Sequence, residues 1–249
     1  MSIYLPPSLD VDIRHTVIST WHDHFPFGYD LIAELRPKVA VELGTYSGLS
    51  FFCFCQSMAV HNIDGMCYAV DTWEGDDHTG AYGEATYQTV NKHLRDHYRG
   101  LAYMLRMTFD EARDHFTDDS IDLLHIDGLH TYDAVKHDFT TWYSKVAPGG
   151  VILFHDIEAR MKDYGAWKFW QELERDHQTF AFKHGFGLGV LQKPGGTKPL
   201  GPLLELLFEG GEESAQKLRK LYAHISRYRD AVRKLRNIES RAAASAGAN

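Results

Sequence analysis

The sequence predicts an α/β fold in which helices cover both faces of a mostly parallel sheet. Short apolar runs alternate with amphipathic stretches along most of the 249 residues, and 44% of the residues are hydrophobic, which is ample for a buried core. Two further apolar runs, at 180–183 and 188–191, are joined by the glycine-containing turn HGFG. They predict an antiparallel hairpin that closes the sheet at the C-terminal side.

The elements are expected in regular alternation. The predicted strands before the hairpin lie at 39–43, 66–70, 102–105, 121–126 and 151–154. The predicted helices of the sheet domain lie at 49–58, 110–116, 132–146 and 166–177. Residues 73–86 are polar and rich in Gly and Asp, which is typical of an active-site loop.

The chain divides into five predicted segments. These are an N-terminal helical segment at 1–35, the sheet domain at 36–193, a linker at 194–211, an amphipathic helix at 212–241 and a disordered tail at 242–249. In the C-terminal helix, apolar residues keep alternating spacings of three and four: Leu218, Leu221, Ile225, Tyr228, Val232 and Leu235. This stripe is either a face docked on the chain's own domain or a seam for a homo-oligomer.

Charge and composition limit the partners. A net charge of -8 would repel a phosphate backbone, so we expect no nucleic-acid substrate and favour a small molecule or a glycan. The sequence has no run of about 18 uncharged apolar residues and no N-terminal targeting pattern, which predicts a cytoplasmic protein without a membrane span. The three cysteines, at 53, 55 and 67, are expected to be buried, reduced thiols.

A glycine turn follows the first predicted strand. The segment VELGTYSG places Glu42, Gly44 and Gly48 in an E-x-G-x-x-x-G pattern between a strand and a helix, where the backbone approaches a ligand closely. A carboxylate there suits the ammonium and sulfonium of S-adenosylmethionine (SAM) better than a pyrophosphate. Asp71 ends the second strand and is expected to bind ribose hydroxyls, while Trp73 or Phe109 is a candidate to stack on adenine.

Acidic residues and histidines follow two other predicted strands, in LLHIDGLHTY (123–132) and ILFHD (152–156). Because parallel strands end at one edge of a sheet, Asp127 and Asp156 are candidates to share Mg²⁺ or Mn²⁺, with His155 as a further ligand. His130 is the candidate general base, since an imidazole can titrate near neutral pH. The alternative is that both carboxylates cap helices or contact SAM.

Two more histidines have less direct interpretations. His125 lies inside a predicted strand, so a structural role is expected for it. His78 lies in the loop GDDHTG and is either a substrate contact or a solvated loop residue.

Together these motifs resemble the class I SAM-dependent methyltransferases, on a Rossmann-like sheet, and in particular the bacterial methyltransferase-24-like group. The resemblance covers about residues 36–193 and includes VELGTYSGLS, VDTWEGDDHTGAYGE, RMTFDEA, LLHIDGLHTYDAV, PGGVILFHD and GLGVL in that order. It implies SAM binding by Glu42, Gly44, Gly48 and Asp71, and a site across Asp127, His130 and Asp156.

The same resemblance implies a reaction. Members of this group are similar to sugar and polysaccharide tailoring enzymes, so methyl transfer from SAM to a sugar or glycan-precursor hydroxyl is expected, with divalent-metal assistance. Metal-dependent relatives have an acidic pair after the fifth strand, where this chain has His155 and Asp156, and some have an acid where this chain has Leu129. The alternatives are a noncatalytic SAM-binding or scaffold module and, since G-x-G-x-x-G is absent, less plausibly a nicotinamide-dependent oxidoreductase.

Overall fold

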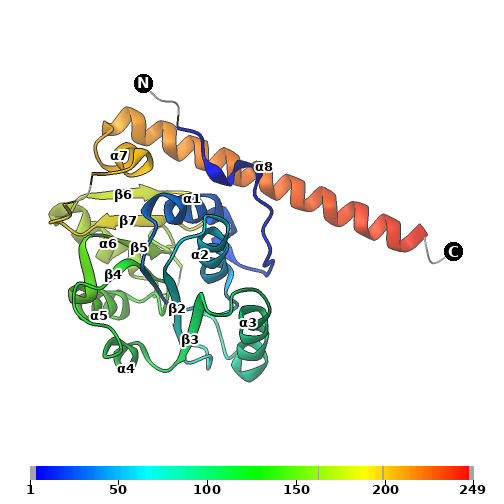
Figure 1. The fold of residues 1–249 in the computed structure, drawn as a ribbon, viewed down its shortest axis with the longest axis horizontal. Coiled ribbons are helices and arrows are strands. Elements are labelled where there is room, and N and C mark those ends of the chain that lie inside the picture. The colour runs from blue at the N-terminus through cyan, green and yellow to red at the C-terminus, as the bar shows by residue number, and fades with distance from the viewer. Residues whose placement is uncertain (1–3, 162, 198, 247–249) are drawn as a thin grey trace.

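The computed structural model describes residues 4–161, 163–197 and 199–246, and its centre is one seven-stranded sheet (Figure 1). The strands are β1 (Val39–Leu43), β2 (Met66–Asp71), β3 (Ala102–Arg106), β4 (Ile121–Ile126), β5 (Val146–His155), β6 (Thr179–Phe182) and β7 (Leu188–Gln192). Their order is β3-β2-β1-β4-β5-β7-β6. The first five run parallel, and β7 pairs antiparallel with both β5 and β6, so the predicted mostly parallel sheet with a closing antiparallel hairpin is confirmed.

Helices cover both faces of the sheet. The α-helices are α1 (Phe25–Leu35), α2 (Leu49–Val60), α3 (Gly83–His97), α4 (Phe109–Arg113), α5 (Tyr132–Trp142), α6 (Ala166–Asp176), α7 (Pro202–Phe208) and α8 (Gly211–Ala246). One core cluster joins the sheet to α1, α2, α3, α7 and α8, and the other joins it to α4, α5 and α6. Short 3-10 turns, η1 (Pro7–Asp10), η2 (Thr20–Asp23) and η3 (Tyr143–Lys145), complete the chain.

Helix α3 is the main element that the sequence analysis missed. It begins at Gly83, so the loop expected at 73–86 ends at Tyr82. Only two of its side chains, Val90 and Leu94, are buried, and this narrow apolar stripe is a weak helical signal. Their spacing of four residues was the available clue.

The C-terminal region differs from the predicted linker, helix and tail. The linker expected at 194–211 contains α7, whose first amides donate to the Glu34 carboxylate, from Leu203 N at 2.7 Å and from Leu204 N at 2.8 Å. The following helix is longer than predicted, because α8 continues through residues 242–246 of the expected tail, while 247–249 lie outside the described residues. Buried leucines of α7, including Leu207, explain why this segment is helical rather than an open linker.

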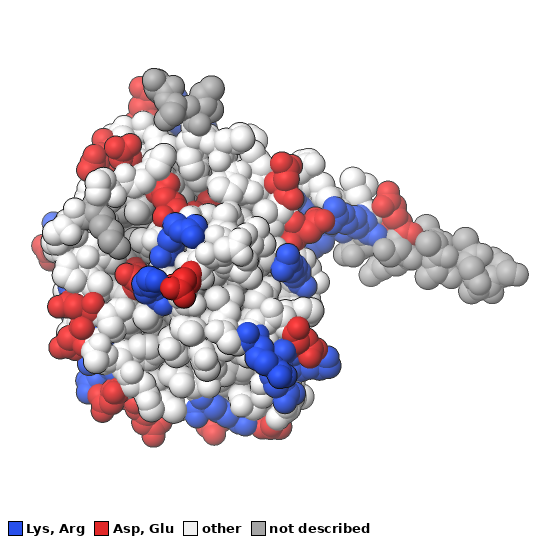
Figure 2. Space-filling view, viewed as in Figure 1, with Lys and Arg blue, Asp and Glu red and all other residues white. Residues whose placement is uncertain are grey.

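Helix α8 has two unlike halves. In the first half, Leu218 and Ile225 are buried against the chain's own domain, which confirms a docked face there. In the second half, Tyr228 is 64% exposed and Leu235 is 59% exposed, and the helix projects away from the sheet domain (Figure 1). Figure 2 shows both acidic and basic side chains on the described part of this projecting segment. The predicted stripe is therefore divided between a docked half and an open half.

Docking of α8 is anchored at Asp30 on α1, whose carboxylate accepts hydrogen bonds from Ser8 N at 2.7 Å, Ser8 Oγ at 2.8 Å and Tyr222 Oη at 2.8 Å. Burial raises the pKa of Asp30 to about 7, although these donors oppose the shift. The three cysteines, at 53, 55 and 67, are buried free thiols, as expected. Among the described residues, every helix is either too short or too polar to cross a membrane.

Candidate active site

The glycine turn and the acidic cluster meet at the carboxyl edge of the sheet. Gly44 follows β1 with φ +88, and a Cβ on it would lie 2.2 Å from the carbonyl oxygen of Asp127. Asp127 follows β4 and donates its amide to Leu43 O at 2.9 Å. Glycine at 44 is therefore required both by the positive φ and by this close approach, which sets the two clusters side by side.

Glu42 is buried below the turn. It is 1% exposed, and its Oε2 accepts a hydrogen bond from His125 Nδ1 at 2.9 Å. The other ring nitrogen of His125 accepts from Trp21 Nε1 at 3.2 Å, so this histidine is structural, as expected. Glu42 Oε1 has no hydrogen-bond partner among the described residues, which leaves one oxygen available for a cation.

Asp71, at the end of β2, holds the glycine turn closed. Its carboxylate accepts from the amides of Thr45 at 2.9 Å, Tyr46 at 2.8 Å and Trp73 at 2.7 Å, and from Tyr82 Oη at 3.2 Å. Only the last donor is a side chain. The Tyr82 hydroxyl is therefore the one donor that a ligand hydroxyl can replace without unfolding the turn.

Trp73 and Phe109, the two candidates to stack on adenine, differ in how exposed their rings are. Trp73 is 0% exposed and donates its indole N–H to Tyr46 O at 3.0 Å, so its ring is enclosed by the chain, and its stacking on adenine stays a prediction. Phe109 begins α4 and is half-buried, with its ring against Gly128, where a Cβ would lie 2.6 Å from Phe109 Cε2. Tyr46, which the sequence analysis passed over, is 42% exposed beside the turn.

The acidic and histidine cluster lies beside this turn. Asp127, His130 and Asp156 each present one ligand atom, and these atoms lie within 4.8 Å of one another. His130 Nε2 is 3.0 Å from Asp156 Oδ2. His155 was expected to be a ligand, but it does not belong to this group of three. Its Nδ1 lies 3.1 Å from Asp127 Oδ1, where the ring orients that carboxylate, and its role as a metal ligand stays a prediction.

Burial dominates the electrostatics of the cluster. It raises the pKa of Asp127 to about 8 and that of Asp156 to about 6, although the neighbouring His155 opposes the shift at Asp156. Burial also lowers the pKa of His130 to about 3, so its imidazole is neutral at pH 7, and the expectation that it titrates near neutral pH is wrong for the site without ligands. Two crowded carboxylates beside a neutral imidazole form a donor set that suits a divalent cation such as Mg²⁺ or Mn²⁺.

The rings of His78 and Tyr164 cover the ring of His130. Asp76 accepts hydrogen bonds from His78 N and from Thr79 N and Oγ1 in a tight turn, which holds His78 in place. The His78 side chain is 1% exposed, and its ring stacks on Tyr164 with centroids 4.4 Å apart and lies parallel to His130 at 5.7 Å. His78 is therefore not a solvated loop residue. Nothing in the sequence near Tyr164 marked it as a site residue, because only the fold brings it here.

The comparisons with known proteins agree on a methyltransferase fold. Residues 41–157 match the methyltransferase-24 family model, described as a methyltransferase domain. The chain is 47% identical over 173 residues to uncharacterized protein y4gI of Sinorhizobium fredii, a match that covers 70% of this chain and 19% of that relative. The chain thus spans about a fifth of the length of this relative.

Two solved structures show the same fold. A methyltransferase from Geobacter sulfurreducens matches with a TM-score of 0.53 and 16% identity, over 70% of this chain and 80% of that one. The O-methyltransferase TomG from Streptomyces achromogenes, solved in complex with SAM, matches with a TM-score of 0.52 and 15% identity, over 72% of this chain and 82% of that one. Residues 41–157 therefore match a methyltransferase domain model, and the sheet has the class I methyltransferase fold of these solved structures.

Proposed function

We propose that this protein is a SAM-dependent O-methyltransferase that methylates a hydroxyl of a sugar or glycan precursor with the assistance of Mg²⁺ or Mn²⁺. The observation that supports this most is the group of Asp127, His130 and Asp156, which lies directly beside the Gly44 turn. A methyl donor held at the turn and a hydroxyl held at the acidic group would then be neighbours. Methyl transfer requires this alignment above all.

The cofactor residues follow from the unused hydrogen-bonding capacity at the turn. SAM supplies an electrophilic methyl group. Glu42 Oε1 is a buried acceptor for the ammonium, and Asp71 is the acceptor for ribose hydroxyls once Tyr82 moves aside. Gly44 and Gly48, at φ +88 and +82, keep the backbone open to the ligand, and Phe109 remains the candidate for the adenine.

Asp127 and Asp156 would hold the divalent cation, which supplies Lewis acidity that lowers the pKa of an acceptor hydroxyl. His155 fixes the orientation of Asp127 through the contact between its Nδ1 and Oδ1. His130 is the proposed general base. When its Nε2–H donates to Asp156, its Nδ1 keeps a lone pair that can take a proton from the acceptor, and the carboxylate stabilises the resulting imidazolium. The His78 and Tyr164 rings would shield this proton from bulk water.

The decisive experiment is a screen of glycans and nucleotide sugars with methyl-labelled SAM, with and without EDTA. We expect label transfer that is lost on chelation and restored by added Mn²⁺ or Mg²⁺. Asp127→Asn should lose transfer, whereas Asp64→Asn, on the opposite edge of the sheet and fully exposed, should not. Transfer that is insensitive to EDTA would remove the metal from the proposal. SAM binding without turnover on any acceptor would instead indicate a noncatalytic module.

A further inference from the structure

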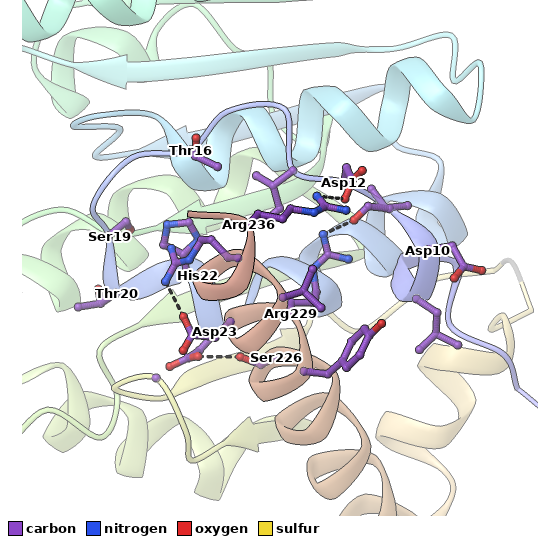
Figure 3. A pocket seen from close by; sticks show the side chains of 18 of the residues that line it. Asp10, Asp12, Thr16, Ser19, Thr20, His22, Asp23, Ser226, Arg229 and Arg236 are labelled. Atoms are coloured by element: carbon purple, nitrogen blue, oxygen red, sulfur yellow. Dashed lines mark hydrogen bonds and ion pairs between the residues drawn. The ribbon is translucent and has the colours of Figure 1, made fainter. Parts of the chain in front are cut away.

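A cavity with a volume of about 900 Å³ lies outside the candidate active site (Figure 3). Its walls are the N-terminal segment from Leu9 to Asp23, the face of α8 from Ser226 to Arg236, and the turn at Gly185 and Phe186 between β6 and β7. This volume falls within the range that protein pockets offer to small-molecule ligands. No residue proposed for SAM or the cation lines it.

The wall chemistry favours a neutral, hydroxyl-rich ligand. Four aspartates and three arginines line the cavity, and several of them are already paired. Arg236 meets Asp12 at 2.7 Å (Figure 3), and Arg233 meets Asp230 at 2.6 Å. Near-balanced charge gives little net attraction for an anion or a cation, while paired carboxylates and guanidinium groups still offer acceptors and planar donors to hydroxyls. An apolar ligand would bury the polar groups of this wall without giving them hydrogen-bond partners.

Two further features indicate a ligand. Arg229 donates from its terminal nitrogens to Ser8 O and Val11 O, but its buried Nε has no hydrogen-bond partner among the described residues. Tyr228, 64% exposed, and Phe186, 39% exposed, present aromatic rings at the cavity wall. An unused buried donor beside exposed aromatic rings suits a pyranose, which offers hydroxyl acceptors at its rim and an apolar C–H face to a ring.

The cavity is separated from the acidic cluster by a single turn. Ser226 Oγ donates to Asp23 Oδ1 at 2.6 Å on the cavity side, and the ring of the next residue, His24, contacts Gly185 O at 3.0 Å and lies 5.6 Å from the ring of His155. Phe186 O accepts the amide of Glu158, two residues after Asp156, at 2.8 Å. A ligand in the cavity that passes over Phe186 therefore reaches the segment that carries Asp156, one of the two proposed metal ligands.

We propose that this cavity is a carbohydrate subsite that holds the neutral sugar units of a glycan acceptor next to the unit that is methylated. The assignment of these units to an acceptor rests on the proposed function, but carbohydrate binding by the cavity does not. The N-terminal segment and α8 would then select acceptors by their length. The methyl transfer itself would take place at the sheet edge.

The test measures binding without SAM or a metal. Saturation-transfer NMR and calorimetry are run on the full chain with maltotriose, cellotriose, chitotriose and mannotriose as probes. We expect at least one neutral trisaccharide to bind, and Tyr228→Ala to weaken that binding about tenfold, because one stacked ring is lost. Asp10→Ala, which removes an acceptor from the wall, should also weaken it. Tyr103→Ala is the matched control, since Tyr103 is 44% exposed on β3.

The outcomes separate this proposal from the proposed function. Trisaccharide binding that persists in Asp127→Asn supports the subsite even if no methyl transfer is found. Absence of binding for all four probes, an equal loss in Tyr103→Ala, or a preference for a sulfated trisaccharide over its neutral form would overturn it. Thermal melting of each variant confirms that the fold is retained.

Discussion

Two carboxylates at the sheet edge, Asp71 and Asp127, differ in how many hydrogen bonds they accept from the chain. Asp71 accepts three backbone amides and one hydroxyl, and its role in holding the Gly44 turn is complete within the chain. Asp127 has His155 as its one side-chain hydrogen-bond partner among the described residues, and burial raises its pKa to about 8. A saturated carboxylate preserves a shape, whereas an undersatisfied one favours a proton or a cation. On the proposed function, the turn held by Asp71 is the positioning half of the site, and the group of Asp127, His130 and Asp156 is the chemical half.

The largest effect is expected at the chemical half. His130→Ala should lower turnover on the order of 100-fold or more, because the general base is lost, while SAM affinity and the metal requirement stay close to wild type. Raising the pH should partly restore turnover, since the acceptor hydroxyl then ionises without an internal base. Steady-state kinetics with labelled SAM give the measurement. His137→Ala, at an exposed histidine paired with Asp110, is the control. Normal turnover in His130→Ala would move the role of base to another residue.

Asp127→Asn tests whether Asp127 is a metal ligand in the chemical half of the site. The substitution preserves size but removes an anionic ligand, so activity should fall and the Mg²⁺ or Mn²⁺ concentration that supports half-maximal activity should rise by at least about tenfold. A metal titration of turnover measures the shift. An unchanged metal dependence would mean that Asp127 acts by hydrogen bonding alone.

At the positioning half, Asp71→Ala should act on cofactor binding and on the fold together. We expect SAM affinity to weaken by roughly 1.5 to 3 kcal/mol, and unfolding free energy to fall by about 1 to 3 kcal/mol, because buried amides lose their acceptor. Calorimetry and denaturant titration measure the two effects. Tyr82→Phe removes only the replaceable hydroxyl, so it should leave SAM affinity at least as strong as in wild type. If Asp71→Ala changes neither quantity, the carboxylate does not hold the turn.

The raised carboxyl pKa values predict how pH acts on the chemical half. Protons compete with a cation for Asp127, at a pKa of about 8, and for Asp156, at about 6, so Mn²⁺ affinity should rise with pH between about 6 and 8. The rise should approach tenfold per pH unit for each proton released. Without metal, the free energy of unfolding depends on pH in the opposite direction. A carboxyl pKa raised by folding favours the folded state at low pH, and that contribution is lost as pH rises toward 8. Calorimetry across this range should show a flatter Mn²⁺ profile for Asp127→Asn.

The smallest effect on stability is expected in the open half of α8. Removing residues 231–249 should shift the thermal midpoint by less than about 2 °C, because the docked residues Leu218, Tyr222 and Ile225 remain. If exposed Tyr228 and Leu235 form the predicted self-association seam, light scattering should show an oligomer for the full chain and a monomer for the truncated one. A monomeric full chain would refute the seam.

The fold was predictable to a large extent, and the site only in part. Short apolar runs placed β1 and β4 at their observed bounds, because strands that are buried on both faces read as nearly continuous apolar runs. Helix α3 was missed because its buried stripe is only two residues wide. Asp127, His130 and Asp156 were selected correctly as neighbours, since parallel strands end at one edge. The burial of Trp73 and the contact of His155 with Asp127 depend on packing between distant segments, which no local pattern reports.

The sequence by itself determined the sheet, the glycine turn and the residues gathered at its edge, because these depend on local periodicity and on the common direction of parallel strands. Only the tertiary structure decided how each of those residues is used. It saturated Asp71 with the amides of the turn, left Asp127 crowded and partly buried, and turned His155 toward a carboxylate. It also placed the N-terminal segment against α8 to form the cavity that α8 lines. Solvent exclusion and hydrogen-bond saturation arise from contacts between segments far apart in the chain, so they exist only once the fold is complete.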